Sequence, residues 1–212
     1  MATIQSSDAN PPYLFSFAGA LAVTLLMGVG ITVLDVFQPA EPVLSILAFI
    51  PGGISIAALS ASGLSRADLY LLPAKASRSG LVALAATTLL LLPILGSSTG
   101  WAGWHWLPGL IYAPASGIAQ EMYFRASLLP ALERALHGKK TIAIFLHAVI
   151  FVGYHFRAFR SLPSLPIAIL VASVLFTAGC GWAWQVQRDR TVFWAIGQHS
   201  LFLMLMSMFE WA

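Results

Sequence analysis

The sequence predicts an all-α fold, a polytopic transmembrane helical bundle, and its composition is the first reason. Charged residues are scarce: 11 Lys and Arg and 8 Asp and Glu among 212 residues amount to 9 %, whereas a typical soluble domain has about 25 %. Hydrophobic residues make up 58 %. A soluble domain could not cover its surface with so few charges, and a disordered chain needs the opposite composition, so both classes are excluded. The chain has no dense Lys/Arg cluster to indicate nucleic-acid binding, and its single cysteine, Cys180, cannot form an intramolecular disulfide.

Seven apolar stretches are the second reason, because a span takes about 20 mostly apolar residues. They run over residues 13–34, 43–60, 80–95, 104–132, 141–156, 165–185 and 192–211. The fourth contains Pro108 and Pro114, so it forms either one kinked helix or a short helix and a second one starting near Ala115, which would give eight spans. Residues 1–12 carry no Lys or Arg, so we expect a retained first helix rather than a signal peptide.

The distribution of basic residues predicts an orientation. With seven spans, eight basic residues fall on the N-terminal side and only Arg157 and Arg160 on the other. The positive-inside rule then places the N-terminus in the cytoplasm. The eight residues are Arg66, Lys75, Arg78, Arg134, Lys139, Lys140, Arg188 and Arg190.

Three groups of polar residues interrupt the apolar stretches. An ionisable side chain at membrane depth costs about 2.5–3.5 kcal/mol on insertion scales, so each is a functional candidate. Glu121 and Arg125 are four residues apart and share a helix face, either as an internal salt bridge or as a carboxylate aimed by its arginine. His155 follows Phe151 by one turn, and His199 lies in the last span. Each histidine could also be a packing or interhelical hydrogen-bonding residue.

Counting from the predicted cytoplasmic ends, Glu121, His155 and His199 lie at similar depths. We therefore expect them to meet in one cavity in the cytoplasmic half to the middle of the bilayer. One carboxylate and two imidazoles permit two chemistries. They can activate a water and stabilise an oxyanion, or they can bind Zn²⁺. We favour the metal-free chemistry, with no cofactor, because no His-Glu-x-x-His pair is present.

These residues resemble the motifs of the CAAX protease and bacteriocin-processing family of intramembrane proteases, also called the CPBP or Abi family. The family pattern is Glu-Glu-x-x-x-Arg, then Phe-x-x-x-His, then His-x-x-x-Asn/Asp on a late helix. The sequence has Gln120-Glu121-x-x-x-Arg125, Phe151-x-x-x-His155 and His199-x-x-x-Leu203. The resemblance covers residues 104–211, the protease-like core of a single domain spanning 1–212, and it leaves 1–100 as accessory spans.

The sequence departs from the family pattern at two positions. In the family, the first Glu is thought to activate water with the motif-two histidine, and here that position is Gln120, an amide that cannot accept a proton. The Asn/Asp that helps the oxyanion is replaced by Leu203. Three outcomes stay open. Glu121 acts as the base, which needs a local rotation or π-bulge; His155 acts as the base with Gln120 holding the water; or the protein is catalytically silent.

The resemblance implies an intramembrane endopeptidase in which Glu121, His155 and His199 are catalytic and Gln120, Arg125 and Phe151 support them. Its partners would be the bilayer and a membrane-embedded or lipid-anchored substrate, and its location a bacterial or archaeal cell membrane. The alternative is a non-catalytic binding or immunity-type relative. A proton-coupled transporter is a third reading, disfavoured because no internal repeat is visible.

Overall fold

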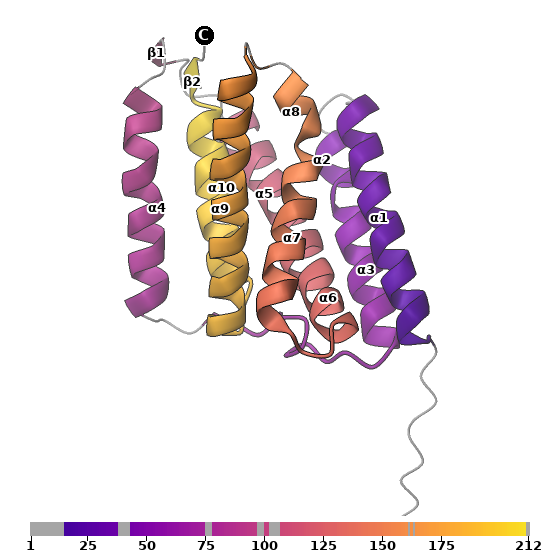
Figure 1. Cartoon of the computed structure of the whole chain (residues 1–212). Helices are drawn as coiled ribbons and strands as arrows, with labels where there is room; N and C mark the ends of the chain where they lie inside the picture. Colours follow the sequence, from indigo (N-terminus) through magenta and orange to yellow (C-terminus); the bar gives the residue numbers. More distant parts are fainter. Residues whose placement is uncertain are drawn as a thin grey trace, which may run out of the picture.

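The computed structural model describes residues 15–37, 43–74, 78–96, 100–101, 107–160, 162 and 164–210 (Figure 1). Two short strands, β1 (Gly100–Trp101) and β2 (Phe209–Glu210), pair antiparallel at one end of the bundle. With η marking a π-helical turn, the helical segments are α1 (Phe17–Phe37), α2 (Val43–Leu47), α3 (Phe49–Ala61), α4 (Arg78–Gly96), η1 (Pro108–Tyr112), α5 (Ala113–Tyr123), η2 (Phe124–Leu128), α6 (Leu129–Ala135), α7 (Lys140–Tyr154), α8 (Phe156–Arg160), α9 (Leu165–Asp189) and α10 (Phe193–Met206).

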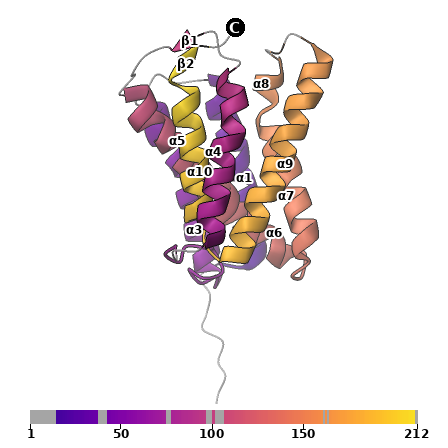
Figure 2. The ribbon, with the colours of Figure 1, turned by 90° about the vertical axis from the view of Figure 1, so that its left-hand side faces the viewer.

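The structure is a helical bundle, which confirms the predicted all-α class. The long helices lie side by side along a common direction in both views (Figures 1 and 2). Among the described residues, three segments are long and apolar enough to cross a membrane: Phe17–Leu34, Val43–Ala61 and Leu165–Asp189. Lys140–Tyr154 and Phe193–Met206 are apolar but shorter. The count of seven spans therefore stays a prediction.

Large apolar side chains cover much of the outer surface of the bundle. Leu26, Val82, Leu165 and Leu170 are each more than half exposed. A surface with so many exposed apolar groups would aggregate in water, and it is the surface that a lipid-facing bundle requires.

The fourth predicted stretch is one continuous helix from Leu107 to Ala135, so the alternative of two separate helices is not what forms. Two π-helical turns widen it, and each turn is followed within two residues by a proline, Pro114 after η1 and Pro130 after η2. A proline ring clashes with the carbonyl four residues earlier, and a wider turn relieves that clash without breaking the helix.

Several predicted boundaries differ from those observed. The expected ends at Tyr13, Trp104 and Trp211 lie outside the described residues. α7 ends at Tyr154, two residues before the predicted end, and α9 continues to Asp189, beyond the predicted end at residue 185. α2 and α3 together replace the single stretch predicted over residues 43–60.

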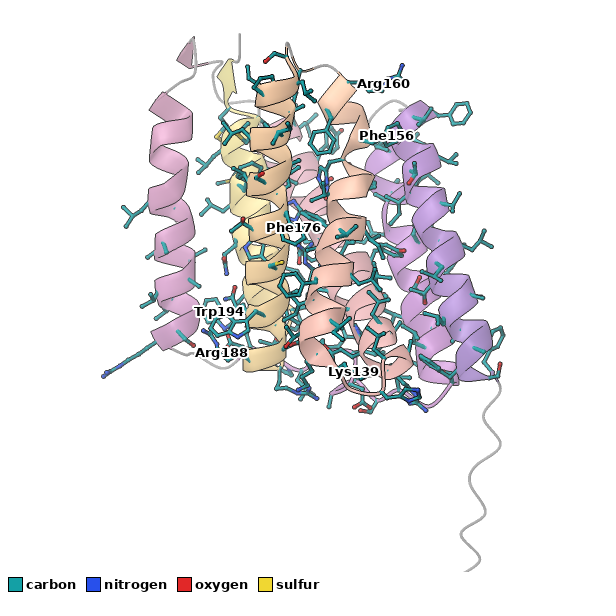
Figure 3. The ribbon with its side chains drawn as sticks, viewed as in Figure 1. Lys139, Phe156, Arg160, Phe176, Arg188 and Trp194 are labelled. Atoms are coloured by element: carbon teal, nitrogen blue, oxygen red, sulfur yellow. The ribbon has the colours of Figure 1, made fainter. Side chains whose placement is uncertain are left out.

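Most of the basic side chains lie at one end of the bundle, which we call the basic end. Hydrogen bonds join its loops and helix ends: the Tyr70 hydroxyl donates to Glu133, Gln187 Nε2 donates to Glu133 Oε1 at 2.6 Å, and the Val192 amide donates to the Tyr70 carbonyl. Figure 3 labels Lys139 and Arg188 at this end and Arg160 at the other. The basic end carries Arg66, Arg78, Arg134, Lys139, Lys140, Arg188 and Arg190. Lys75 lies outside the described residues.

The segment α5–η2–α6 forms the centre of the bundle, where α3, α7 and α10 pack against it. All five residues of η2 are buried. The approach of α10 is close at Gly117, where an added Cβ would lie 2.9 Å from Ser200 Oγ and 3.0 Å from Ser200 Cα. A glycine is therefore needed there for α5 and α10 to touch.

We predict that Gly117→Ala separates α5 from α10 and lowers the free energy of unfolding by about 1–3 kcal/mol, the usual cost of overpacking. Gly197→Ala is the matched control, because nothing lies within 4 Å of its added Cβ. Thermal unfolding of both variants in lipid or detergent measures the difference. Equal stability of the two variants would contradict the close packing.

Candidate active site

Glu121 and Arg125 form an ion pair in the interior of the bundle. Arg125 Nη1 donates to Glu121 Oε1 at 2.9 Å, and both side chains are fully buried. His199, which reaches in from α10, donates from Nδ1 to the same oxygen at 2.7 Å, since a carboxylate only accepts. The structure thus brings together Glu121 and Arg125 of the first motif and His199 of the third motif in one group, which we call the buried cluster.

Aromatic rings enclose the guanidinium of Arg125. Its Cζ lies 4.3 Å from the ring centroid of Phe151 and 5.2 Å from that of Trp182. The Trp182 ring also stacks on His199, with centroids 5.0 Å apart. Within the described residues, Arg125 Nε and Nη2 have no hydrogen-bond partner, so these rings supply the remaining electrostatic contacts of the cation.

His155 stands at the C-terminal end of α7. Its Nδ1 lies 2.8 Å from the carbonyl oxygen of Phe151, one turn earlier. A carbonyl can only accept, so Nδ1 carries the proton and the lone pair of the neutral ring lies on Nε2. The Phe151 ring packs edge-on against the imidazole, with centroids 4.7 Å apart. The backbone and the ring of Phe151 therefore set both the tautomer and the orientation of His155.

A cavity of about 270 Å³ lies beside His155. Its polar wall consists of Ser45, Ser116, Gln120, Tyr154 and His155. Its apolar wall consists of Ile31, Leu34, Leu44, Ala48, Ala119 and Leu203. Several of these residues come from α1 and α2, so the spans expected to be accessory supply part of the wall. The motif positions Gln120, His155 and Leu203 all line this cavity.

Gln120 and Glu121 face different surroundings because they are neighbours on a regular helix. Consecutive α-helical residues point about 100° apart, and α5 is regular from Ala113 to Tyr123. The π-turns of this helix occur at η1 and η2, on either side of these two residues, so no π-bulge rotates Glu121 toward the cavity. Gln120 therefore lines the cavity while Glu121 contacts His199.

The structure thus places the predicted site residues in two groups. Glu121, Arg125 and His199 form the buried cluster, whereas Gln120 and His155 line the cavity. Phe151 contacts both groups, since its ring packs on Arg125 and on His155. Whether Glu121 and His199 themselves take part in chemistry stays a prediction.

Sequence reasoning singled out Gln198 with His199 as a polar group that could form an interhelical hydrogen bond, but it missed Ser116 beside Gln120 and the α9 partners Trp182 and Gln185 of Gln198. Gln120 Nε2 donates to Ser116 Oγ at 3.2 Å, and the Gln198 amide joins Trp182 to Gln185 through hydrogen bonds of 3.1 and 2.8 Å. Ser116 lies four residues before Gln120, so helical spacing alone could have identified it. No comparable sequence signal exists for the α1 and α2 residues, which reach the cavity through tertiary packing.

The described residues contain no group of three or more His, Cys, Asp or Glu side chains placed to hold a metal ion. The expectation of a metal-free site is not tested by that observation and stays a prediction.

A helical bundle with an apolar exterior and a buried Glu–Arg–His cluster is the architecture of an integral membrane protein with an internal polar site. Residues 99–205, half of the chain, match the family described as type II CAAX prenyl endopeptidase Rce1-like. The chain belongs to this family, whose members are integral membrane peptide hydrolases, and the resemblance inferred from the three motifs is confirmed. No match is found among curated proteins or among solved structures.

We predict that Arg125→Met lowers the free energy of unfolding by about 3–5 kcal/mol, because Glu121 would lose its cationic partner while still buried. Arg66→Met removes the same charge at an exposed position, so its effect should stay within about 0.5 kcal/mol. Unfolding by denaturant in detergent micelles measures both variants. If Arg125→Met is as stable as Arg66→Met, the ion pair does not support the fold.

Proposed function

We propose that this protein is an intramembrane endopeptidase that cleaves a membrane-embedded or lipid-anchored protein or peptide in the cavity between Gln120 and His155. The observation that supports this proposal most directly is the convergence of these two motif positions on the wall of one cavity. Family membership supports peptide hydrolysis in general. The cavity indicates where in the molecule the peptide bond would be held.

In the proposed mechanism, His155 is the general base. Because its Nδ1 proton is held by the Phe151 carbonyl, Nε2 is the nitrogen that accepts a proton. Gln120 Oε1 is buried without a hydrogen-bond partner among the described residues, so it can accept one from an attacking water. That water passes its other proton to His155 Nε2 as its oxygen attacks the amide carbon. The resulting imidazolium then protonates the leaving amine.

The buried cluster would act as a support for this base. Arg125 packs on the Phe151 ring, and Phe151 in turn orients His155 by its ring and its carbonyl. Glu121 and His199 hold Arg125 and α10 in place. Arg125 and Phe151 are therefore positioning residues. A direct catalytic role for Glu121 and His199, as the motifs imply, is the alternative mechanism, and the same cleavage assay tests it.

We also propose that the protein works as a seven-span membrane protein with its N-terminus in the cytoplasm. The support is the concentration of basic side chains at the basic end, whereas the other end has Arg160 and the α8 position 157. Positively charged short loops are retained in the cytoplasm. We propose further that catalysis needs no metal, with zinc held by Glu121, His155 and His199 as the alternative.

A non-catalytic binding or immunity-type protein is the second candidate. The observation that favours it is the composition of the cavity wall: none of the described residues lining it is Asp or Glu, and Leu203 stands where the family has Asn or Asp. Such a cavity could hold a membrane peptide without cleaving it.

We predict that the purified protein in lipid cleaves peptides and that His155→Ala lowers the rate by about 10²–10⁴-fold, the usual contribution of a general base. His137→Ala, at an exposed loop position, is the matched control. If the buried cluster only supports the base, Glu121→Gln should lower the free energy of unfolding and change the cleavage rate less than His155→Ala does. A metal chelator should leave the rate unchanged. Cleavage that is indifferent to His155→Ala and Glu121→Gln would rule out the proposed enzyme.

We predict that Gln120→Glu raises the cleavage rate at least about tenfold, because a carboxylate beside His155 adds a stronger proton acceptor to the cavity. Gln120→Met keeps the size of the side chain but removes its oxygen, so it should slow cleavage. Initial rates on one peptide measure both variants. No gain with Gln120→Glu and no loss with Gln120→Met would mean that the chemistry does not use this position.

A further inference from the structure

The cavity lies far from the basic end. α7 begins at Lys140, beside the basic end, and His155 follows its last residue. At 1.5 Å per residue, His155 is about 22 Å along the bundle from Lys140. Leu34 is in the last turn of α1, whose first residue is Phe17, so it lies about 26 Å along that helix. The α2 residues that line the cavity follow directly after the same end of α1 (Figure 1).

The buried cluster extends from the middle of the bundle to the depth of the cavity, since Glu121 is about 21 Å along its helix from Ala135 at the basic end. His199 is the seventh residue of α10, which starts next to the basic end, so it is about 9 Å from that start. Leu203, which lines the cavity, is one turn further from the basic end. The expected position in the cytoplasmic half to the middle therefore fits His199, whereas Glu121 and the cavity residues Gln120 and His155 lie about 21–22 Å from the basic end along their own helices.

We infer that the cavity opens toward the extracytoplasmic side of the membrane and accepts peptide segments presented there. The hydrocarbon core is about 30 Å thick, so a group about 22 Å from the cytoplasmic end lies in the far half of the bilayer. The positive-inside rule assigns the basic end to the cytoplasm, and His155, Leu34 and the α2 wall lie at the other end.

This inference rests on the proposed function and narrows its substrate class. A peptide bond reaches His155 most directly from a segment that leaves a span on the extracytoplasmic side. A tail that stays in the cytoplasm would have to insert about 22 Å into the bundle to reach the same imidazole. The favoured substrate is therefore a chain whose cleavage site lies at the outer membrane–water boundary.

The first test is cysteine accessibility in intact cells, in a Cys180→Ala background. Thr141→Cys reports the basic end, Ser164→Cys reports the opposite end, and Leu44→Cys reports the cavity; the first two positions are exposed. We expect a membrane-impermeant maleimide to modify Ser164→Cys and Leu44→Cys in intact cells. Thr141→Cys should react only after permeabilisation. Reaction of Thr141→Cys in intact cells, with protection of Ser164→Cys, would overturn the inference and leave the proposed peptidase activity standing.

The second test uses two single-span substrates that carry the same peptide segment, one at the cytoplasmic boundary and one at the extracytoplasmic boundary. We expect the extracytoplasmic substrate to be cleaved at least about tenfold faster, and His155→Ala to abolish that cleavage. Preferential cleavage of the cytoplasmic substrate would overturn the inference alone. If neither substrate nor any free peptide is cleaved, the proposed function fails, and the accessibility pattern still decides which side the cavity faces.

Discussion

The buried ion pair between Glu121 and Arg125 is the interaction on which the rest of the structure depends. Both side chains are fully excluded from solvent, and a charge in such a place is tolerated only when it is paired and hydrogen-bonded. The two side chains pair with each other, His199 from α10 donates to Glu121, and the rings of Phe151 from α7 and Trp182 from α9 contact the cation, while Arg125 Nε and Nη2 and Glu121 Oε2 have no hydrogen-bond partner among the described residues. Satisfying one buried cation therefore determines how three other helices are rotated against α5 and η2.

The same constraint determines what is left for the cavity. Once Glu121 contacts His199, the preceding residue points about 100° away, and Gln120 becomes the motif-one residue that faces the cavity. The substitution of Gln for Glu at that position thus removes the carboxylate from the cavity and leaves the buried cluster intact. Leu203 extends the apolar wall in the same way. The two departures from the family pattern, Gln120 and Leu203, therefore change the cavity only.

The two π-turns show how one long helix supplies residues to both the buried cluster and the cavity. Pro114 and Pro130 would each clash with a carbonyl one turn earlier, and η1 and η2 absorb these clashes on either side of Gln120 and Glu121. Within η2, the Ser127 hydroxyl donates to the Met122 carbonyl five residues earlier at 2.8 Å, a spacing that suits the wider turn. Arg125 lies in this turn and still reaches Glu121, while α5 stays regular through Gln120 and Glu121.

The sequence by itself determined the class of protein, the approximate helices and the family. Scarce charge and long apolar runs are local properties, and the order of Glu121, Arg125, His155 and His199 along the chain carries the family motifs. Only the tertiary structure decided that Glu121 belongs to the buried cluster while His155 lines the cavity, and that residues of α1 and α2 form part of the cavity wall. The reason is geometric: neighbouring helical residues point about 100° apart, and only packing between helices distant in sequence determines which of them faces which surroundings.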